Sequence, residues 1–293
     1  MTDSVAPPVA AARLTQLGAI MVTGADARVY LQGQVTADLD QLSPSRVQLA
    51  CCNSAQGRVQ AVFWMLQRGD GIALILPATM IDTTVTRLRK YVLRAKAKIE
   101  GAPDMQVGML ARSALPTDVT LSGSHAHQQL GGVSYFNLPG IDDVLVLGAN
   151  VAAADDAREQ HWKLAQVRVG LPQVHPETHE AFVAQMLNLD LLDGISFEKG
   201  CYTGQEIIAR AHFRGAVKRR MFRFSFAGSP PAPGTRVLAG EQHAGDVVDA
   251  AATDGGGELL AVISLAQLDK ALHIEGRDAP LSRHDLPYPV PVG

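Results

Sequence analysis

Residues 199–206 read Lys-Gly-Cys-Tyr-Thr-Gly-Gln-Glu, and this segment organises the interpretation of the whole chain. Thr203 and Glu206 have the spacing of a capping box, in which the hydroxyl accepts a hydrogen bond from a helix N–H and the carboxylate reaches back to the cap. The spacing therefore predicts a helix that begins near Gly204. Gly215 is the residue expected to end it.

Cys201 stands directly ahead of this expected helix. Helix N–H groups and the macrodipole favour negative charge there, and Lys199 adds a full positive charge two residues earlier. Both effects lower the pKa of a thiol, and the thiolate is the reactive form of cysteine. A lone cysteine is also often a small buried hydrophobe. From these residues alone, a packing role and a nucleophilic role both stay open.

The composition describes an ordinary folded protein. The 293 residues are 47% hydrophobic and 19% charged, which provides ample core and argues against disorder. A net charge of -3 argues against bulk electrostatic attraction to nucleic acid or anionic lipid. Three cysteines do not form a disulfide framework, no apolar run has the length of a membrane span, and residues 1–8 do not resemble a secretory signal. We expect a cytoplasmic protein.

Strand and helix patterns alternate up to about residue 200. Helical spacing of apolar residues is found over Ile81–Leu93, and a second helix is expected over about Val151–Val167. The segment Gly123–Gly132 is expected to be a loop. Strand signals occur at Ala19–Val22, Val47–Cys52, Val59–Leu66, Ile72–Leu76, Gln106–Ala111, Val133–Asn137, Val144–Leu147 and Ile195–Phe197.

The pattern changes after Arg220. Phe222, Phe224 and Phe226 alternate with polar residues, as expected for a half-buried strand. Short strand signals follow at Arg236–Ala239, Ala244–Val248, Leu259–Ile263 and Ala271–Ile274. Short, evenly spaced strands predict a small barrel or sandwich.

No metal site is predicted. Cys51 and Cys52 are adjacent, so in a strand their side chains point to opposite faces. With only Cys201 besides them, the chain lacks a four-cysteine site for zinc or an iron–sulfur cluster. His175 and His179 have helical spacing, but the proline between them disfavours a helix that carries both.

Several segments together resemble the YgfZ family of folate-binding proteins, which is related to the T-protein of the glycine cleavage system. The most specific is 199–206, which continues as Ala209-Arg210-x-x-Phe213-Arg214-Gly215. The others are Leu31–Leu39, Asn53–Arg58, Trp162–Pro172, Asn188–Asp190 and Leu272–Ile274.

The resemblance implies an α+β, T-protein-like fold. Two interleaved ferredoxin-like α/β units and a C-terminal β-barrel would surround a central channel. The expected domains are a folate-binding α/β region over residues 1–220, made of two interleaved subdomains, and the barrel over residues 221–293. Family members bind tetrahydrofolate or a derivative and support iron–sulfur cluster assembly or repair, and thereby tRNA modification. The expected partners are folate and iron–sulfur proteins or their assembly factors, with no membrane and no direct RNA binding.

The resemblance also assigns site residues. Cys201 and Lys199 would form the catalytic pair. The residues expected to bind the cofactor are Trp162, Tyr202, Gln205 and Arg168, and those expected to shape the motif are Gly200, Thr203, Gly204 and Glu206.

One departure argues against a classical aminomethyltransferase. T-proteins carry an Asp pair on the strand after the Asn…Gly turn, and one Asp assists the one-carbon transfer. Gln60 and Ala61 stand there in this chain, and neither an amide nor a methyl group can take up a proton. A folate-dependent aminomethyl or methyl transferase is therefore the alternative function. A third interpretation is an RNA-binding module that uses a basic cluster, Arg210, Arg214, Lys218, Arg219 and Arg220. We favour the simpler interpretation, in which these charges are solvated beside the barrel.

Overall fold

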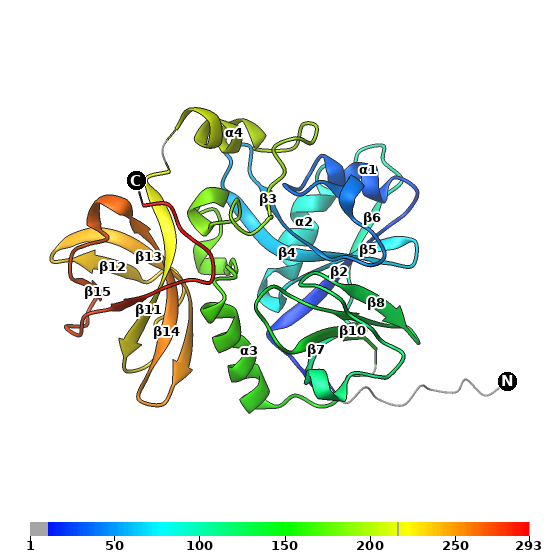
Figure 1. Ribbon diagram of the computed structural model, residues 1–293. Helices are drawn as coiled ribbons and strands as arrows, with labels where there is room; N and C mark the ends of the chain where they lie inside the picture. Colours follow the sequence, from blue (N-terminus) through cyan, green and yellow to red (C-terminus); the bar gives the residue numbers. More distant parts are fainter. Residues whose placement is uncertain (1–10, 150, 216, 293) are drawn as a thin grey trace. The chain divides into compact units, whose positions relative to one another are not determined.

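The structure is a computed structural model that describes residues 11–149, 151–215 and 217–292, apart from the side chain of Arg214. Contacts along the chain divide it into two compact units whose segments interleave in sequence. The first unit contains residues up to Leu31, Leu39–Gln48 and Phe63–Trp162. The second contains Gln32–Asp38, Leu49–Val62 and Lys163 onward. The α-helices are α1 (Ala27–Gln32), α2 (Ile81–Arg89), α3 (Asp156–Arg168) and α4 (Gln205–Arg214), as labelled in Figure 1.

The first unit contains a five-stranded antiparallel sheet. Its strands lie in the order β1 (Ala12–Arg13), β7 (Gln106–Leu110), β10 (Val144–Gly148), β9 (Val133–Phe136) and β8 (His127–Leu130). Strand β8 lies inside the segment expected to be a loop, so that expectation was wrong. Gly131 and Gly132 both have positive φ, which lets the chain turn tightly and pair Leu130 with Val133.

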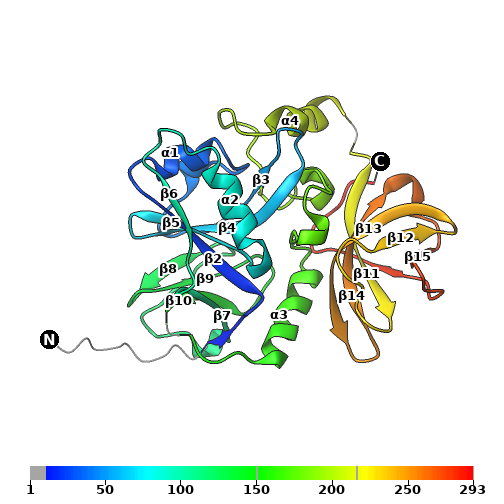
Figure 2. The same ribbon diagram turned by 180° about the vertical axis from the view of Figure 1, so that it is seen from behind.

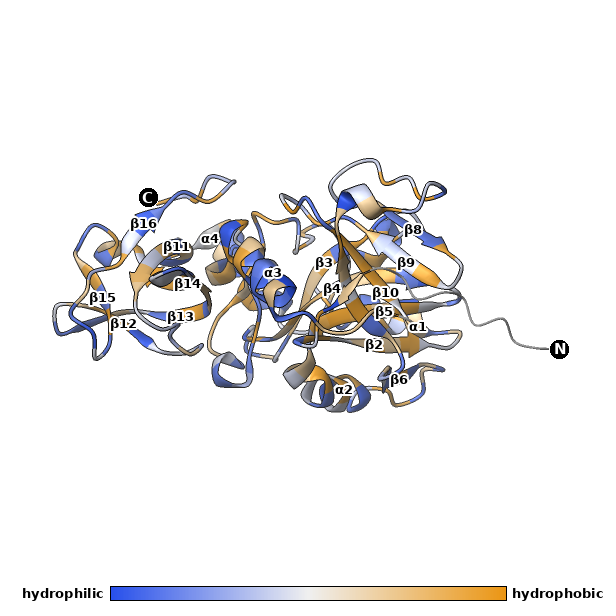
Figure 3. Ribbon diagram, turned by 90° about the horizontal axis from the view of Figure 1, so that it is seen from below, coloured by the Kyte–Doolittle hydropathy of each residue, from blue (hydrophilic) through white to orange (hydrophobic). Residues whose placement is uncertain are grey.

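A second sheet has the order β3 (Gln48–Asn53), β4 (Val59–Arg68), β5 (Gly71–Pro77), β2 (Leu17–Thr23) and β6 (Lys98–Gly101). Strands β3 and β4 contribute residues to both units. In the first unit, α2 packs against β2 and β6, as seen from behind in Figure 2. Val85 and Leu88 of α2 are buried, and Figure 3 shows hydrophobic residues concentrated on β2, β4 and β5.

The C-terminal part of the second unit is a six-stranded antiparallel sheet. Its order is β15 (Leu272–Ile274), β12 (Arg236–Ala239), β13 (Gln242–Thr253), β14 (Gly256–Ser264), β11 (Arg219–Ala227) and β16 (Ser282–His284). Phe222, Phe224 and Phe226 are buried in one apolar core, as their alternation predicted. The N–H of Leu281 donates to Leu272 O at 2.7 Å, so the chain leading into edge strand β16 contacts edge strand β15. The sheet curls on itself, as in a barrel.

Two local expectations were wrong. The strand expected at Ile195–Phe197 is irregular chain, where the N–H of Ser196 donates to Thr36 O at 2.9 Å. The helix expected from about Val151 begins at Asp156, because the Asp155 carboxylate accepts from the N–H groups of Ala157 and Arg158 and sets the start. None of the helices in the described residues is long and apolar enough to cross a membrane.

Candidate functional site

Lys199 joins two of the segments that carried the family resemblance. Its side chain is buried, and Nζ donates to the carbonyls of Gln32, Val35 and Ala37 at 2.7, 2.9 and 2.7 Å. An ammonium group has three N–H donors, and these three carbonyls account for them. The cation therefore holds the 32–38 segment against the 199–206 loop.

Thr36 adds a second set of bonds around the same loop. Its hydroxyl donates to Gly194 O at 2.6 Å and accepts from the N–H of Cys51 at 2.9 Å. The N–H of Thr203 donates to Gly33 O at 3.2 Å. The contacts with Gly194 and Gly33 connect positions more than 150 residues apart in the chain, and they fix the backbone on both sides of Cys201.

The start of α4 differs from the predicted capping box. Gly204 is the N-cap residue, with φ of 82°, and none of the described side chains caps the helix start. The expectation that Thr203 and Glu206 cap each other was wrong, because a left-handed residue at position 204 separates Thr203 from the helix. Gly215 does follow the last helical residue, as expected.

Gly204 is also where the 53–58 turn meets the loop. A Cβ at position 204 would lie 2.6 Å from Ser54 O and 3.0 Å from the Asn53 Cβ. In the same turn, Gly57 has φ of 70° and lies directly against Ile207 of α4. Gly204 thus permits close approach of the protein's own backbone, whereas a Cβ at Gly200 would meet nothing within 4 Å.

Gly204→Ala is expected to lower the free energy of unfolding by about 2–3 kcal/mol, since it adds left-handed strain and a clash with a backbone oxygen. Chemical denaturation measures this difference. Gly200→Ala is the matched control, with an expected change within about 0.5 kcal/mol because φ is not left-handed and the space is open. Equal losses in the two variants would contradict the argument.

The cysteines lie in different surroundings. Cys201 is exposed, while Cys51 and Cys52 are fully buried in β3. Burial raises the pKa of the Cys51 thiol to about 12, although a bond with Thr36 opposes the rise. Cys51 is therefore a neutral packing group, and Cys201 is the thiol that solvent reaches.

Thiol labelling of the native protein at pH 8 is expected to modify Cys201 rapidly and Cys51 and Cys52 only after unfolding. Mass mapping of iodoacetamide adducts identifies the sites. In denaturant all three thiols should react at similar rates. Rapid native labelling of either strand cysteine would contradict the burial described above.

Tyr202 and Gln205 flank the cysteine on its helix side. Tyr202 is buried, and Lys199 Nζ lies 5.3 Å from the centre of its ring, within the range of a cation–π contact. Burial, and then the proximity of Cys51, raises the pKa of the Tyr202 phenol, so it stays protonated. Gln205 is half-buried, and Glu206 is exposed on the first turn of α4.

Trp162 and Arg168 both belong to α3 but fall in different compact units. Trp162 is only 2% exposed, and its Nε1–H has no hydrogen-bond partner in the part of the chain that the structure describes. Arg168 is exposed, and its guanidinium donates to Glu258 Oε1 of β14 at 2.8 Å. The folate contact expected of Arg168 would therefore compete with an ion pair inside the second unit.

The sequence interpretation missed Glu180. The Gln60 amide donates to Glu180 Oε1 at 2.6 Å, so a carboxylate lies beside the position where T-proteins carry an acid. Glu180 has φ of 59°, unusual for a residue other than glycine. Its N–H donates to Val59 O, which fixes it against the start of β4. The two partners are 120 positions apart in the chain, so no local sequence pattern indicates their contact.

The basic cluster considered for RNA is partly neutralised. Arg220 is buried against Asp190, and Arg219 lies 3.8 Å from Asp246. The side chain of Arg214 lies outside the described residues. Within the described parts of the chain, no group of three or more His, Cys, Asp or Glu side chains is arranged to hold a metal ion.

Comparison with known proteins gives the family. No family model matches the chain. It is 35% identical over 222 residues to the tRNA-modifying protein YgfZ of Yersinia pestis (strain Pestoides F), an alignment that covers 69% of this chain and 67% of the relative. It is 29% identical to the tRNA-modifying protein YgfZ of Aliivibrio fischeri (strain MJ11), over 98% of this chain and 94% of the relative.

A solved structure shows the same fold. The glycine cleavage system aminomethyltransferase T from Bartonella henselae matches with a TM-score of 0.69 and 12% identity, over 96% of this chain and 86% of that one. The predicted α+β, T-protein-like fold is confirmed. From its similarity to the curated relatives, the chain belongs to the YgfZ family.

Proposed function

We propose that this protein is a tetrahydrofolate-binding accessory factor for iron–sulfur cluster assembly or repair, and that it supports tRNA modification indirectly. The names of its relatives support the link to tRNA modification, and the shared fold with an aminomethyltransferase supports folate. The protein would act in the cytoplasm, through residues 1–220 with the barrel of residues 221–293 attached. Its partners would be iron–sulfur proteins or their assembly factors.

The observation that carries the proposal is the setting of Cys201. Cys201 is exposed, while the backbone on either side is held by the Lys199 carbonyl contacts and by the close packing of Gly204. A thiol that served only packing would not need an exposed place on a firmly anchored loop. Cys201 would supply the reactive sulfur, and Lys199 would hold the loop and add positive charge.

The aromatic and amide groups of the chain fit a folate. Trp162 has a flat indole, buried in the structure, and an N–H donor with no partner in the described residues. Tyr202 and Gln205 follow the cysteine by one and four positions in the chain. Tetrahydrofolate would supply a flat ring for stacking and a carrier for one-carbon groups. Trp162 would stack on it, and Gln205 would give it an amide contact. Arg168 could join only by exchanging its bond to Glu258.

Two measurements on purified protein and cells test the proposal. Cys201→Ala should abolish complementation of a strain deficient in this factor, with an unchanged unfolding midpoint. Trp162→Phe should weaken tetrahydrofolate binding by about ten-fold in calorimetry, because the smaller ring lacks the N–H and part of the stacking area. Full complementation by Cys201→Ala would remove the thiol from the mechanism, and the absence of folate binding to the parent protein would remove the cofactor.

The alternative is a folate-dependent aminomethyl or methyl transferase. It is favoured by one observation, the Glu180 carboxylate at 2.6 Å from the Gln60 amide. A carboxylate there could take a proton during transfer. Turnover of a one-carbon donor with tetrahydrofolate, reduced at least 100-fold in Glu180→Gln, would support this alternative. Absence of turnover would leave the accessory function.

A further inference from the structure

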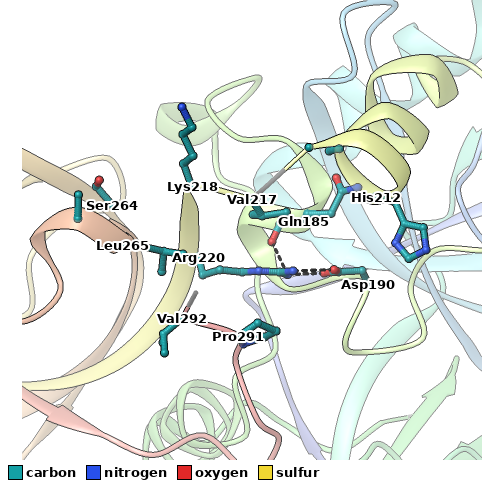
Figure 4. Close-up of a pocket in the computed structure, with 13 residues that line it drawn as sticks. Gln185, Asp190, His212, Val217, Lys218, Arg220, Ser264, Leu265, Pro291 and Val292 are labelled. Atoms are coloured by element: carbon teal, nitrogen blue, oxygen red, sulfur yellow. Dashed lines mark hydrogen bonds and ion pairs between the residues drawn. The ribbon is translucent and has the colours of Figure 1, made fainter.

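A cavity of about 490 Å³ lies in the second unit, beside the C-terminal sheet. Side chains from α4, from the start of β11, from the end of β14 and from the C-terminal tail line it, as Figure 4 shows. This volume is typical of a site for a small organic molecule. None of the residues assigned to the folate or cysteine function lines it.

One wall of the cavity is apolar. It is built from Val217, Leu265, Ala266, Pro291 and Val292. Val292 is 60% exposed, so an apolar side chain stands open to solvent beside the cavity. Such a wall gives favourable burial to a hydrocarbon or an aromatic ring.

Another part of the lining is polar, and one of its hydrogen-bond donors is left without an acceptor among the described residues. The Arg220 guanidinium donates to both Asp190 oxygens, at 2.6 and 2.9 Å, and to Gln185 O at 2.9 Å. These bonds use three of its five N–H donors. The Nε–H of Arg220 is buried and has no hydrogen-bond partner among the described residues, and it forms a second two-donor edge with the remaining N–H of Nη2.

The charges of the lining leave one cation without a counter-ion. Asp190 compensates Arg220, whereas Lys218 has no carboxylate within 4 Å among the described residues. Lys218 is exposed, and Figure 4 shows its side chain extending away from the Arg220–Asp190 pair, at the edge of the cavity. A buried donor edge and an uncompensated ammonium both favour an anion.

We propose that this cavity binds a small organic anion, with an aromatic or aliphatic body on the apolar wall and an oxyanion directed to Arg220. The Lys218 ammonium adds a longer-range attraction from the edge of the cavity. The free edge of the guanidinium matches two oxygens of a carboxylate or a phosphate. The Arg220 Nε–H has no solvent contact, so the anion must displace wall side chains to pair with it. That pairing satisfies a donor that is otherwise buried without a partner. The inference does not depend on the proposed function.

Ligands that share one aromatic ring test the charge requirement. Benzoate, phenyl phosphate, benzyl alcohol and benzylamine are titrated into the full-length protein with labelled methyl groups. The two anions should bind about ten-fold more tightly than benzyl alcohol, with saturable shifts of the Ala266 and Leu265 methyls and of the Arg220 Nε–H resonance. Their relative affinities then distinguish a carboxylate from a phosphate ligand. Equal affinity for the anions and the alcohol, or no saturable shift, would overturn the proposal.

Two variants locate the binding. Lys218→Gln should weaken binding of both anions by about five-fold and leave benzyl alcohol unchanged, since only the charge is removed from an exposed residue. Ala266→Phe should abolish binding by filling the cavity, while Ala232→Phe, an exposed alanine in a turn away from the lining, should not. Anion binding that survives both Lys218→Gln and Ala266→Phe would place the ligand elsewhere and refute the site.

Discussion

Lys199→Met is expected to lower the free energy of unfolding by about 3–5 kcal/mol, because it leaves the carbonyls of Gln32, Val35 and Ala37 without their donor. Methionine preserves the length of the side chain but cannot donate a hydrogen bond. The loss should be visible in equilibrium denaturation as a lower midpoint. The 32–38 segment should also show faster amide hydrogen exchange than the remainder of its unit.

The control for this change is Lys270→Met, which removes the same charge from an exposed residue. Its expected effect is within about 0.5 kcal/mol. A Lys199→Met protein with normal stability but no activity would contradict the anchoring role and leave only a chemical role for the ammonium. A Lys199→Met protein that loses both stability and activity would agree with the structure. Cys201→Ala then tests the role of the thiol separately.

Asp190→Asn is expected to destabilise the protein by about 3–5 kcal/mol, because it leaves the Arg220 cation buried without its carboxylate. The two side chains are 11% and 6% exposed and are joined by bonds of 2.6 and 2.9 Å. Asn188 and Asp190 belong to one predicted family segment, and the Asn188 amide donates to Met221 O next to Arg220. The pair therefore fixes the start of β11 to the 185–190 segment. Differential scanning calorimetry measures this loss in the free energy of unfolding.

Glu275→Gln is a matched control, since Arg236 and Glu275 form an ion pair of 2.8 Å with side chains 50% and 47% exposed. Solvent screens this pair, so its loss should cost less than about 1 kcal/mol. The double variant Asp190→Leu/Arg220→Met should recover much of the stability lost in either single change, because no charge then remains buried. A double variant as unstable as the sum of the singles would contradict this account.

Local patterns predicted much of the fold because burial on one face leaves a periodic record in the sequence. The alternation of Phe222, Phe224 and Phe226 correctly indicated β11, and the spacing in 81–93 located α2. Strand β8 escaped detection because His127–Leu130 is polar, and its pairing depends on two glycines of positive φ. The boundary between a folate-binding region and a barrel at residue 220 stays a prediction, because the two compact units of the structure are made of segments that interleave along the chain.

The candidate site was harder to predict because its contacts join distant segments. The motif around Cys201 was identified, and the thiol is exposed. The motif did not predict which groups its side chains contact. In the sequence Lys199 was interpreted as a charge that activates the thiol, whereas in the structure its N–H groups donate to the carbonyls of residues 32, 35 and 37. The Gln60–Glu180 contact could not be predicted either, because its partners are also far apart in the sequence.

The Lys199 anchor also constrains how the protein is made. The carbonyls that it binds lie 162 to 167 residues earlier in the chain. At about 5–20 residues per second, a ribosome needs roughly 10–30 seconds to synthesise that interval. During this time the 32–38 segment has emerged without its later partner. We expect the nascent chain to be vulnerable to proteases and dependent on chaperones until residue 199 has left the exit tunnel.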